Sequence, residues 1–91
     1  MSPPVAKRFI RECLDSGELI IIQHAKSAMA DDDMIEQDVI NILCGGVVQQ
    51  PEWENNEWRY QVKTQKMVAV VALYEEPNQT RVVTVWVMRR R

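Results

Sequence analysis

The chain has 91 residues, so we expect residues 1–91 to form a single domain. Hydrophobic residues make up 46% of the sequence and the net charge is −2, a combination that excludes a disordered chain. No apolar run approaches the roughly 20 residues that cross a bilayer, and residues 1–8 lead into a charged segment rather than a secretory signal. We therefore expect a cytoplasmic protein without membrane contact.

A helix and a strand are predicted near the N-terminus. Pro3 and Pro4 suit the first turn of a helix, and residues 15–17 are typical helix breakers. Residues 19–22 are short, β-branched and bounded by breakers, which favours a strand. The apolar stripe expected to form the buried face of the helix consists of Val5, Phe9, Ile10, Cys13 and Leu14.

Two more helices are predicted after this strand. In the second, one helical face is formed by Ala25, Ala28 and Met29. For the third, Asp33 has the position of an N-cap with Glu36 as its capping-box partner, and the glycines at 45–46 provide the stop. The buried stripe of the third helix is expected to be Ile35, Val39, Ile42 and Leu43.

The second half of the chain is predicted to form strands. Residues 47–50 read as a short strand, and residues 51–56 read as a loop in which the two asparagines can turn tightly. Trp53 lies in this polar loop, and an exposed tryptophan is typical of a protein interface. Residues 57–64 alternate as in a half-exposed antiparallel strand. One face is expected to carry Trp58, Tyr60 and Val62, and the other Arg59, Gln61 and Lys63.

Residues 67–74 are continuously apolar and residues 80–88 form a second long β-rich run, which favours central strands covered on both faces. Helices come early in the chain and strands come late, an order typical of the α+β class. We expect N-terminal helices packed on a C-terminal antiparallel sheet, with the third helix lying on its central strands. The residues expected in these adjacent central strands are Val68, Val70, Val83 and Val85.

The charges are unevenly distributed along the sequence. Acidic residues gather at Asp31, Asp32, Asp33, Glu36 and Asp38, and arginines gather at Arg81, Arg89, Arg90 and Arg91. We therefore expect one acidic and one basic region on the molecule. The negative net charge argues mildly against nucleic acid as a partner, because nucleic-acid-binding domains are usually basic.

His24 is the only histidine, and it lies between a predicted strand and a predicted helix. It could act as a general acid or base near neutral pH. Its position alone favours a plainer interpretation, a histidine that hydrogen-bonds backbone at a helix start. Lys26 lies just after it, and Arg59 projects from the polar face of its strand. If the sheet brings these residues near Thr84 and Arg89, they form a basic patch suited to phosphate.

Neither a metal nor a cofactor is expected. Cys13 and Cys44 lie on apolar helical faces, which predicts two buried, reduced thiols. His24 has no second histidine to complete a zinc site. The aspartates at 31–33 lack the spaced ligands and distal glutamate of a calcium loop, so capping and turn formation explain them better.

Short motifs in residues 15–88 resemble a small uncharacterised bacterial domain family related to the BrnT, MqsR and RelE toxins. The motifs that carry the resemblance are His24-Ala25, Met29, Ile35, Asp38-Val39, Leu43, Gly46, Arg59-Tyr60, residues 68–71 and residues 82–85. The resemblance implies a RelE-like α+β fold. It also implies an mRNA interferase of a toxin–antitoxin pair, which cleaves RNA through the ribose 2′-hydroxyl without a metal.

The resemblance also implies partners and site residues. The partners would be an antitoxin protein, often of a zinc-finger kind in such families, and RNA or the ribosome. The expected catalytic set is His24 as acid or base with Lys26 and Arg59 as phosphate clamps. The expected RNA-binding set is Tyr60, Thr84 and Arg89. Oligomeric state is not specified by the sequence.

One position departs from the family pattern. The family reads His-Ala-x-x-Arg-Met, and Ala28 stands where that arginine would provide a phosphate ligand from the helix. Lys26 or Arg59 would have to replace it. Ala28 and the negative net charge favour an alternative, a non-catalytic protein-interaction module on the same fold. An endoribonuclease and an interaction module therefore both remain open at this point.

Overall fold

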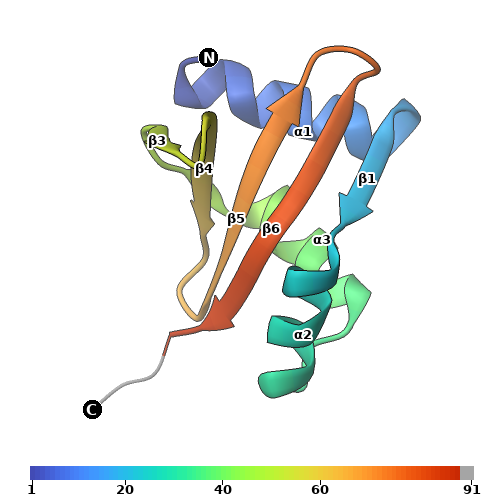
Figure 1. Ribbon diagram of the computed structural model, residues 1–91, viewed down its shortest axis with the longest axis vertical. Helices are drawn as coiled ribbons and strands as arrows, with labels where there is room; N and C mark the ends of the chain where they lie inside the picture. The colour runs from blue at the N-terminus through green and yellow to red at the C-terminus, as the bar shows by residue number, and fades with distance from the viewer. Residues whose placement is uncertain (89–91) are drawn as a thin grey trace.

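The computed structural model describes residues 1–88, and residues 89–91, including the candidate Arg89, lie outside the described part. The helices and strands run in the order α1 (Pro3–Ser16), β1 (Glu18–Ile21), α2 (Gln23–Asp31), α3 (Glu36–Gly45), β2 (Val47–Val48), β3 (Glu52–Glu54), β4 (Glu57–Lys63), β5 (Met67–Tyr74) and β6 (Gln79–Val87). The expected α+β class is confirmed, with helices early and most strands late (Figure 1).

The sheet is mixed rather than wholly antiparallel. Its strand order is β1-β6-β5-β4-β2, and β3 pairs separately with β4. The central positions of β5 and β6 are confirmed, but β1 pairs with β6 in parallel, so the prediction of an antiparallel sheet is wrong at this edge. The register places Leu19 beside the buried Thr80 and Ile21 beside Val82, so this strand continues the covered face of the sheet. The prediction of a loop is also wrong for Glu52–Glu54, which forms β3.

A β-bulge interrupts the pairing of β5 with β6. Val70 lies opposite Thr84 and Val71 lies opposite Val82, so Val83 has no partner on β5. A bulge inserts one residue and increases the local twist of the strand. As a result, Val82 and Val85 lie on the same face of the sheet although two residues, not one, separate them.

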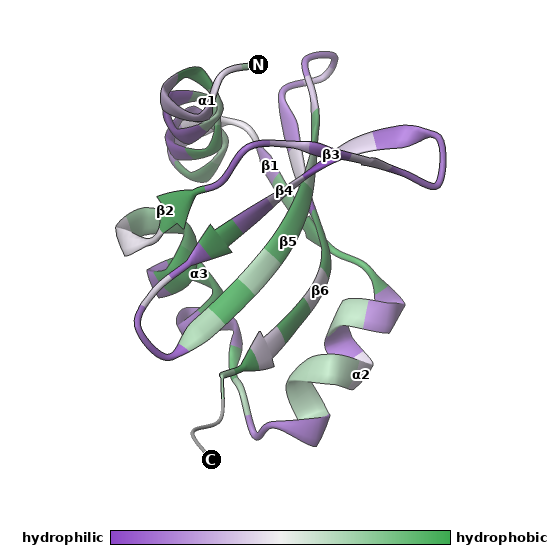
Figure 2. Ribbon diagram, turned by 90° about the vertical axis from the view of Figure 1, so that its left-hand side faces the viewer, coloured by the Kyte–Doolittle hydropathy of each residue, from purple (hydrophilic) through white to green (hydrophobic). Residues whose placement is uncertain are grey.

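The main hydrophobic core lies between one face of the sheet and the two helices α1 and α3, which stand together on that side in Figure 2. Side chains alternate between the two faces of a strand, so this covered face receives every second residue. Its core residues on the strands include Tyr60, Val62, Ala69, Val71, Val82 and Val85. From the helices, the core receives residues of α1, α2 and α3: Ala6, Ile10, Ala25, Met29, Val39, Ile42 and Leu43.

The start of α3 differs from the prediction. Ile35, not Asp33, is the N-cap residue, and 64% of its surface is exposed, so its predicted place in the buried stripe is wrong. Asp33 adopts a left-handed conformation with φ 52° in the preceding turn, and Met34 is buried instead. The Asp38 carboxylate accepts a hydrogen bond of 2.9 Å from the Ile35 N–H and so provides the capping contact.

The two cysteines also differ from each other. Cys13 is buried as predicted, but Cys44 is exposed, so the prediction of two core thiols holds only for the first. The reason is the helical phase of α3, in which Ile42 and Leu43 occupy the buried face and the next residue points outward.

Lys7 connects α1 to the end of α3. Its ammonium donates hydrogen bonds to the carbonyl oxygens of Leu43 and Gly46, at 3.1 Å and 2.5 Å. The last carbonyls of a helix lack partners within the helix and carry partial negative charge, which a cation stabilises. Burial lowers the pKa of Lys7. This side chain therefore joins two helices that cover the same face of the sheet.

Helix α2 lies beside the C-terminal half of β6, where β1 no longer pairs with it (Figure 1). Ala25 and Met29 provide its buried contacts, and both were expected on its apolar face. At the far end of α2, the Asp32 carboxylate accepts a 3.0 Å hydrogen bond from the Val87 N–H. The helix and its following turn thereby protect a strand edge that would otherwise expose its backbone groups.

Candidate nucleic-acid interface

The sheet face turned away from α1 and α3, called here the open face, carries most of the polar side chains of the central strands. Because side chains alternate, Arg59 and Gln61 point to this face while Tyr60 and Val62 point to the core. The register extends the row of Arg59 through Ala72 to Arg81. Figure 2 shows the β3–β4 hairpin and α2 on this side, away from α1 and α3.

Arg59 is held by two glutamates of the same hairpin. Its Nε donates a 2.9 Å hydrogen bond to Glu57, and its guanidinium lies 3.6 Å from the carboxylate of Glu54. The side chain of Arg59 is only 15% exposed, whereas that of Glu54 is 62% exposed. Exposed ion pairs contribute little free energy, so Glu54 is the partner that an incoming anion displaces more easily.

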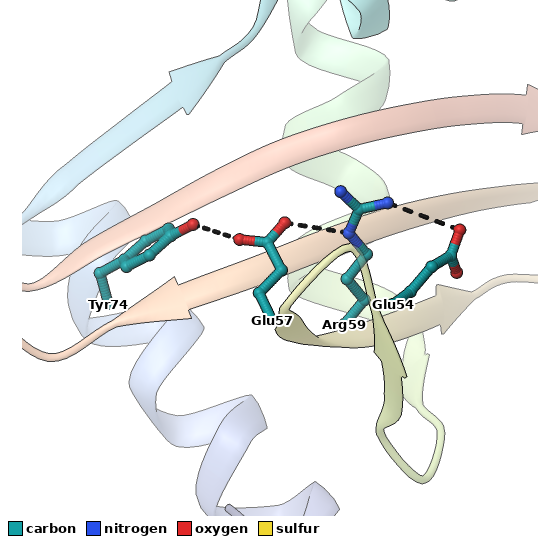
Figure 3. A network of polar contacts seen from close by, with 4 residues as sticks. All are labelled: Glu54, Glu57, Arg59 and Tyr74. Atoms are coloured by element: carbon teal, nitrogen blue, oxygen red, sulfur yellow. Dashed lines mark hydrogen bonds and ion pairs between the residues drawn. The ribbon is translucent and has the colours of Figure 1, made fainter.

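Glu57 connects Arg59 to Tyr74. The Tyr74 hydroxyl donates a hydrogen bond to one carboxylate oxygen of Glu57, and Arg59 binds the other (Figure 3). Partial burial acts to raise the pKa of Glu57, but the hydrogen bonds from Tyr74 and Arg59 outweigh it and hold that pKa below its usual value. The same hydrogen bond, together with burial, raises the pKa of Tyr74. The carboxylate is therefore charged and the phenol is protonated at neutral pH.

Arg81 brings a second guanidinium to the open face. It lies 4.6 Å from the centre of the Tyr74 ring, and its terminal nitrogen donates a 2.8 Å hydrogen bond to Gln79. Its Nε is buried and has no hydrogen-bond partner among residues 1–88. We call Glu54, Glu57, Arg59, Tyr74, Gln79 and Arg81 the polar cluster. Two strand spacings separate the two arginines, roughly 10 Å between their backbones.

His24 and Lys26 are exposed in the first turn of α2. His24 is the second residue of α2, which begins soon after the end of β1. Within the described part of the chain, no hydrogen bond, ion pair or ring contact joins either residue to Arg59 or to the rest of the polar cluster. The structure therefore brings Arg59 together with acidic and aromatic residues, but it does not pair it directly with the histidine.

The RNA-binding candidates have three different positions. Thr84 is half-buried on the open face, opposite Val70. Tyr60 is buried in the core, and its hydroxyl bonds the N-terminal ammonium and the carbonyl oxygen of Met1, at 2.9 Å and 3.2 Å. An aromatic ring in this position packs the core and is not available for stacking on a base. Arg89 lies outside the described residues.

Only Arg59 of the polar cluster was among the sequence candidates. The other five members come from four different strands, and only the pairing register shows that they are neighbours: Glu54, Glu57, Tyr74, Gln79 and Arg81. One signal was present in the sequence. Arg81 interrupts an apolar run, and a charged residue in a central strand needs a partner on the same face.

The β3–β4 hairpin presents an exposed aromatic pair on its other face. Trp53 and Trp58 are 59% and 55% exposed, and their rings meet edge to face with centroids 5.2 Å apart. The tight turn predicted at Asn55 and Asn56 is confirmed, since both have positive φ, which suits a two-residue hairpin loop. Trp58 lies on the face of Tyr60 and Val62, as expected, but it is exposed because the core does not extend to this end of the strand.

No protein-family model, curated protein or solved structure matches this chain. Among residues 1–88, no helix has the length and apolarity needed to cross a membrane. The same described residues contain no group of three or more histidine, cysteine or acidic side chains placed to hold a metal ion.

Proposed function

We propose that this chain is a RelE-like, toxin-like domain that binds RNA on its open face and cleaves it without a metal. The observation that carries the proposal is the pair of guanidiniums, Arg59 and Arg81, aligned across three strands of the open face. The helix α2, which exposes His24 and Lys26, lies further along β6. Arginine binds phosphate through a planar set of donors, and an RNA backbone presents phosphates in series.

In this proposal, phosphate binds Arg59 by displacing the exposed carboxylate of Glu54. Glu57 stays in place, because Tyr74 and Arg59 hold both of its oxygens, and it fixes the direction of the guanidinium. Arg81 binds a neighbouring part of the backbone through the terminal nitrogens of its guanidinium, one of which bonds Gln79 in the free chain. Thr84 provides a hydroxyl on the same face, opposite Val70.

His24 is the proposed proton carrier. The 2′-hydroxyl of the ribose attacks the adjacent phosphate, the bond between phosphorus and the 5′-oxygen breaks, and a 2′,3′-cyclic phosphate and a 5′-hydroxyl are formed. His24 takes the proton of the 2′-hydroxyl or gives a proton to the departing 5′-oxygen, water completes the other transfer, and Lys26 stabilises negative charge on the phosphate. The exposure of both side chains leaves them accessible to a substrate. The proposed setting is the cytoplasm, with the ribosome as a possible site of action and an antitoxin protein as the inhibitor.

The test is cleavage of single-stranded RNA, free or on translating ribosomes, together with growth inhibition on overexpression. We expect His24→Ala to lower the cleavage rate by about 10²–10⁴-fold, the usual contribution of general acid–base catalysis. Gln23→Ala, at the exposed neighbouring position, is the matched control and should keep full activity. Arg81→Gln should weaken RNA binding and reduce its dependence on salt.

A gain-of-function variant complements these losses. Ala28→Arg restores the cation that the resembling family carries in this helix. It should raise the cleavage rate when His24 is present, but not when it is combined with His24→Ala. A wild-type chain that cleaves no RNA and does not inhibit growth overturns the proposal. Cleavage that survives His24→Ala removes this residue from the mechanism.

The second candidate is a non-catalytic interaction module. The observation that favours it is the exposed Trp53–Trp58 pair, since exposed aromatic residues are frequent anchors of protein interfaces. The pairing of Arg59 with two glutamates also favours it, because this cation is already neutralised. Trp53→Ala with Trp58→Ala should then abolish binding to a protein partner, while His24→Ala leaves that binding intact.

A further inference from the structure

A groove of about 810 Å³ lies at one end of the molecule, between the C-terminal end of α3, β2 and the turn from β4 to β5. We call it the end groove. Its lining includes the apolar side chains of Ile42, Val47 and Met67 and the ammonium groups of Lys63 and Lys66. None of its lining residues is acidic, although the chain as a whole has a net charge of −2.

The turn between α2 and α3, residues 31–36, has the opposite chemistry, and we call it the acidic turn. Asp31, Asp33 and Glu36 are exposed, and Ile35 projects among them as one of the most exposed apolar side chains of the described residues. The turn is anchored from below, because Met34 is buried in the core cluster. An acidic loop with a single protruding isoleucine matches the charge and the apolar floor of the end groove.

Both features flank the same strand end. The Val87 N–H donates to Asp32 of the acidic turn, and the Met88 N–H donates a 2.7 Å hydrogen bond to the carbonyl oxygen of Lys66 beside the end groove. The acidic turn and the end groove are therefore close neighbours, and they flank the C-terminal end of β6 on its two sides. Because each is fixed to this strand, a protomer's turn does not enter its own groove.

We propose that the chain forms a two-fold symmetric dimer in which the acidic turn of each protomer inserts Ile35 into the end groove of the other. Two-fold symmetry needs two complementary surfaces near one axis, so that each contact occurs twice. Placement of both surfaces at one end meets this requirement. Lys63 and Lys66 then face Asp31 and Glu36 of the second copy, and the exposed Val47 and Ile35 become buried. This association does not depend on the RNA activity proposed above.

Charge reversal provides a self-checking test by sedimentation equilibrium of the full chain. Lys63→Glu with Lys66→Glu places carboxylates in both grooves, and Asp31→Lys with Glu36→Lys places ammonium groups on both turns. Each double variant alone should dissociate at least tenfold more readily than the wild type. An equimolar mixture of the two should form a heterodimer of near wild-type affinity, because both of its contacts again join opposite charges.

Two further variants separate this contact from general charge effects. Glu12→Lys with Asp15→Lys changes the net charge by the same amount on exposed sites of α1, and it should leave the dimer unchanged. Ile35→Ala leaves every charge in place and should weaken the dimer about tenfold. Circular dichroism checks that each variant is folded. A wild-type chain that stays monomeric at high concentration and low salt, or a mixture that fails to associate, overturns the proposal.

Discussion

The two faces of the sheet are made by the same strands but hold their side chains together in different ways. On the covered face, Val62, Val71 and Val82 are fully buried under α1 and α3, and packing does not depend on a specific polar partner. On the open face, the polar cluster consists of charged and aromatic side chains that bind one another. The covered face is stabilised by area removed from water, and the open face by complementary pairs.

This difference explains why the open face is the better place for a function. A buried valine has no chemistry to offer, and its replacement is felt throughout the core. In the polar cluster, a ligand that binds an arginine more strongly can replace one of its carboxylate partners. Glu54 is the partner that is exposed enough to be displaced. The cluster therefore combines an ordered arrangement with exchangeable contacts, as a binding surface requires.

The largest expected effect separates the two faces at adjacent positions. Val71→Asp places an unpaired carboxylate in the core and should destabilise the chain by more than about 4 kcal/mol, enough to prevent folding. Val70→Asp changes the half-buried open face, where water can reach the carboxylate, and should cost about 2 kcal/mol or less. Urea unfolding followed by circular dichroism measures both. Equal losses would show that the open face is as tightly covered as the other.

A smaller effect is expected where the covered face uses its own polar contact. Lys7→Met should destabilise the chain by about 2 kcal/mol, because the last carbonyls of α3 lose a charged donor. Lys26→Met, at an exposed position in α2, is the matched control and should change the unfolding free energy very little. Equal unfolding free energies for the two variants would show that the hydrogen bonds of Lys7 do not stabilise the fold.

The smallest effect is expected in the polar cluster and depends on pH. Because the folded chain lowers the pKa of Glu57, its contribution is fully present above the unfolded value of about 4.3 and is lost as the pH falls through the lower folded value. Glu57→Gln should cost about 1 kcal/mol or less at neutral pH. The difference from wild type should shrink on acidification below pH 4 or so.

The measurement is the urea midpoint of wild type and Glu57→Gln at a series of pH values. Glu12→Gln, on the exposed side of α1, is the control and should follow the wild type throughout. A gap between wild type and Glu57→Gln that stays constant down to the lowest pH would show that this carboxylate does not act through its charge.

Hydrophobic periodicity was enough to locate the helices and the long strands, because their buried residues recur with the period of each element. It missed β3, since Glu52 and Glu54 are exposed and leave no apolar alternation to detect. It also placed the start of α3 at Asp33, a good N-cap residue by type, which instead forms a left-handed turn. The parallel pairing of β1 depends on a contact distant in sequence, which periodicity does not contain.

The candidate site was harder to predict than the fold. Alternation correctly placed Arg59 opposite Tyr60, but an aromatic residue in a strand reads equally as a stacking platform or as a core residue, and Tyr60 is the latter. The partners of Arg59 come from positions 54, 57 and 74, and their meeting depends on a hairpin and a register that no short motif encodes. Polar networks across strands become visible only once the pairing is known.

The bulge at Val83 has a consequence for how β6 tolerates insertions and deletions. Removing one residue from a regular strand inverts every side chain beyond it, so that core residues emerge into water. Val83 is the unpaired residue, and its removal leaves Val82 inward, Thr84 outward and Val85 inward, as regular alternation demands. Among the positions of this central strand, the bulge is therefore the one at which a single residue can be deleted while every neighbouring side chain keeps its side of the sheet.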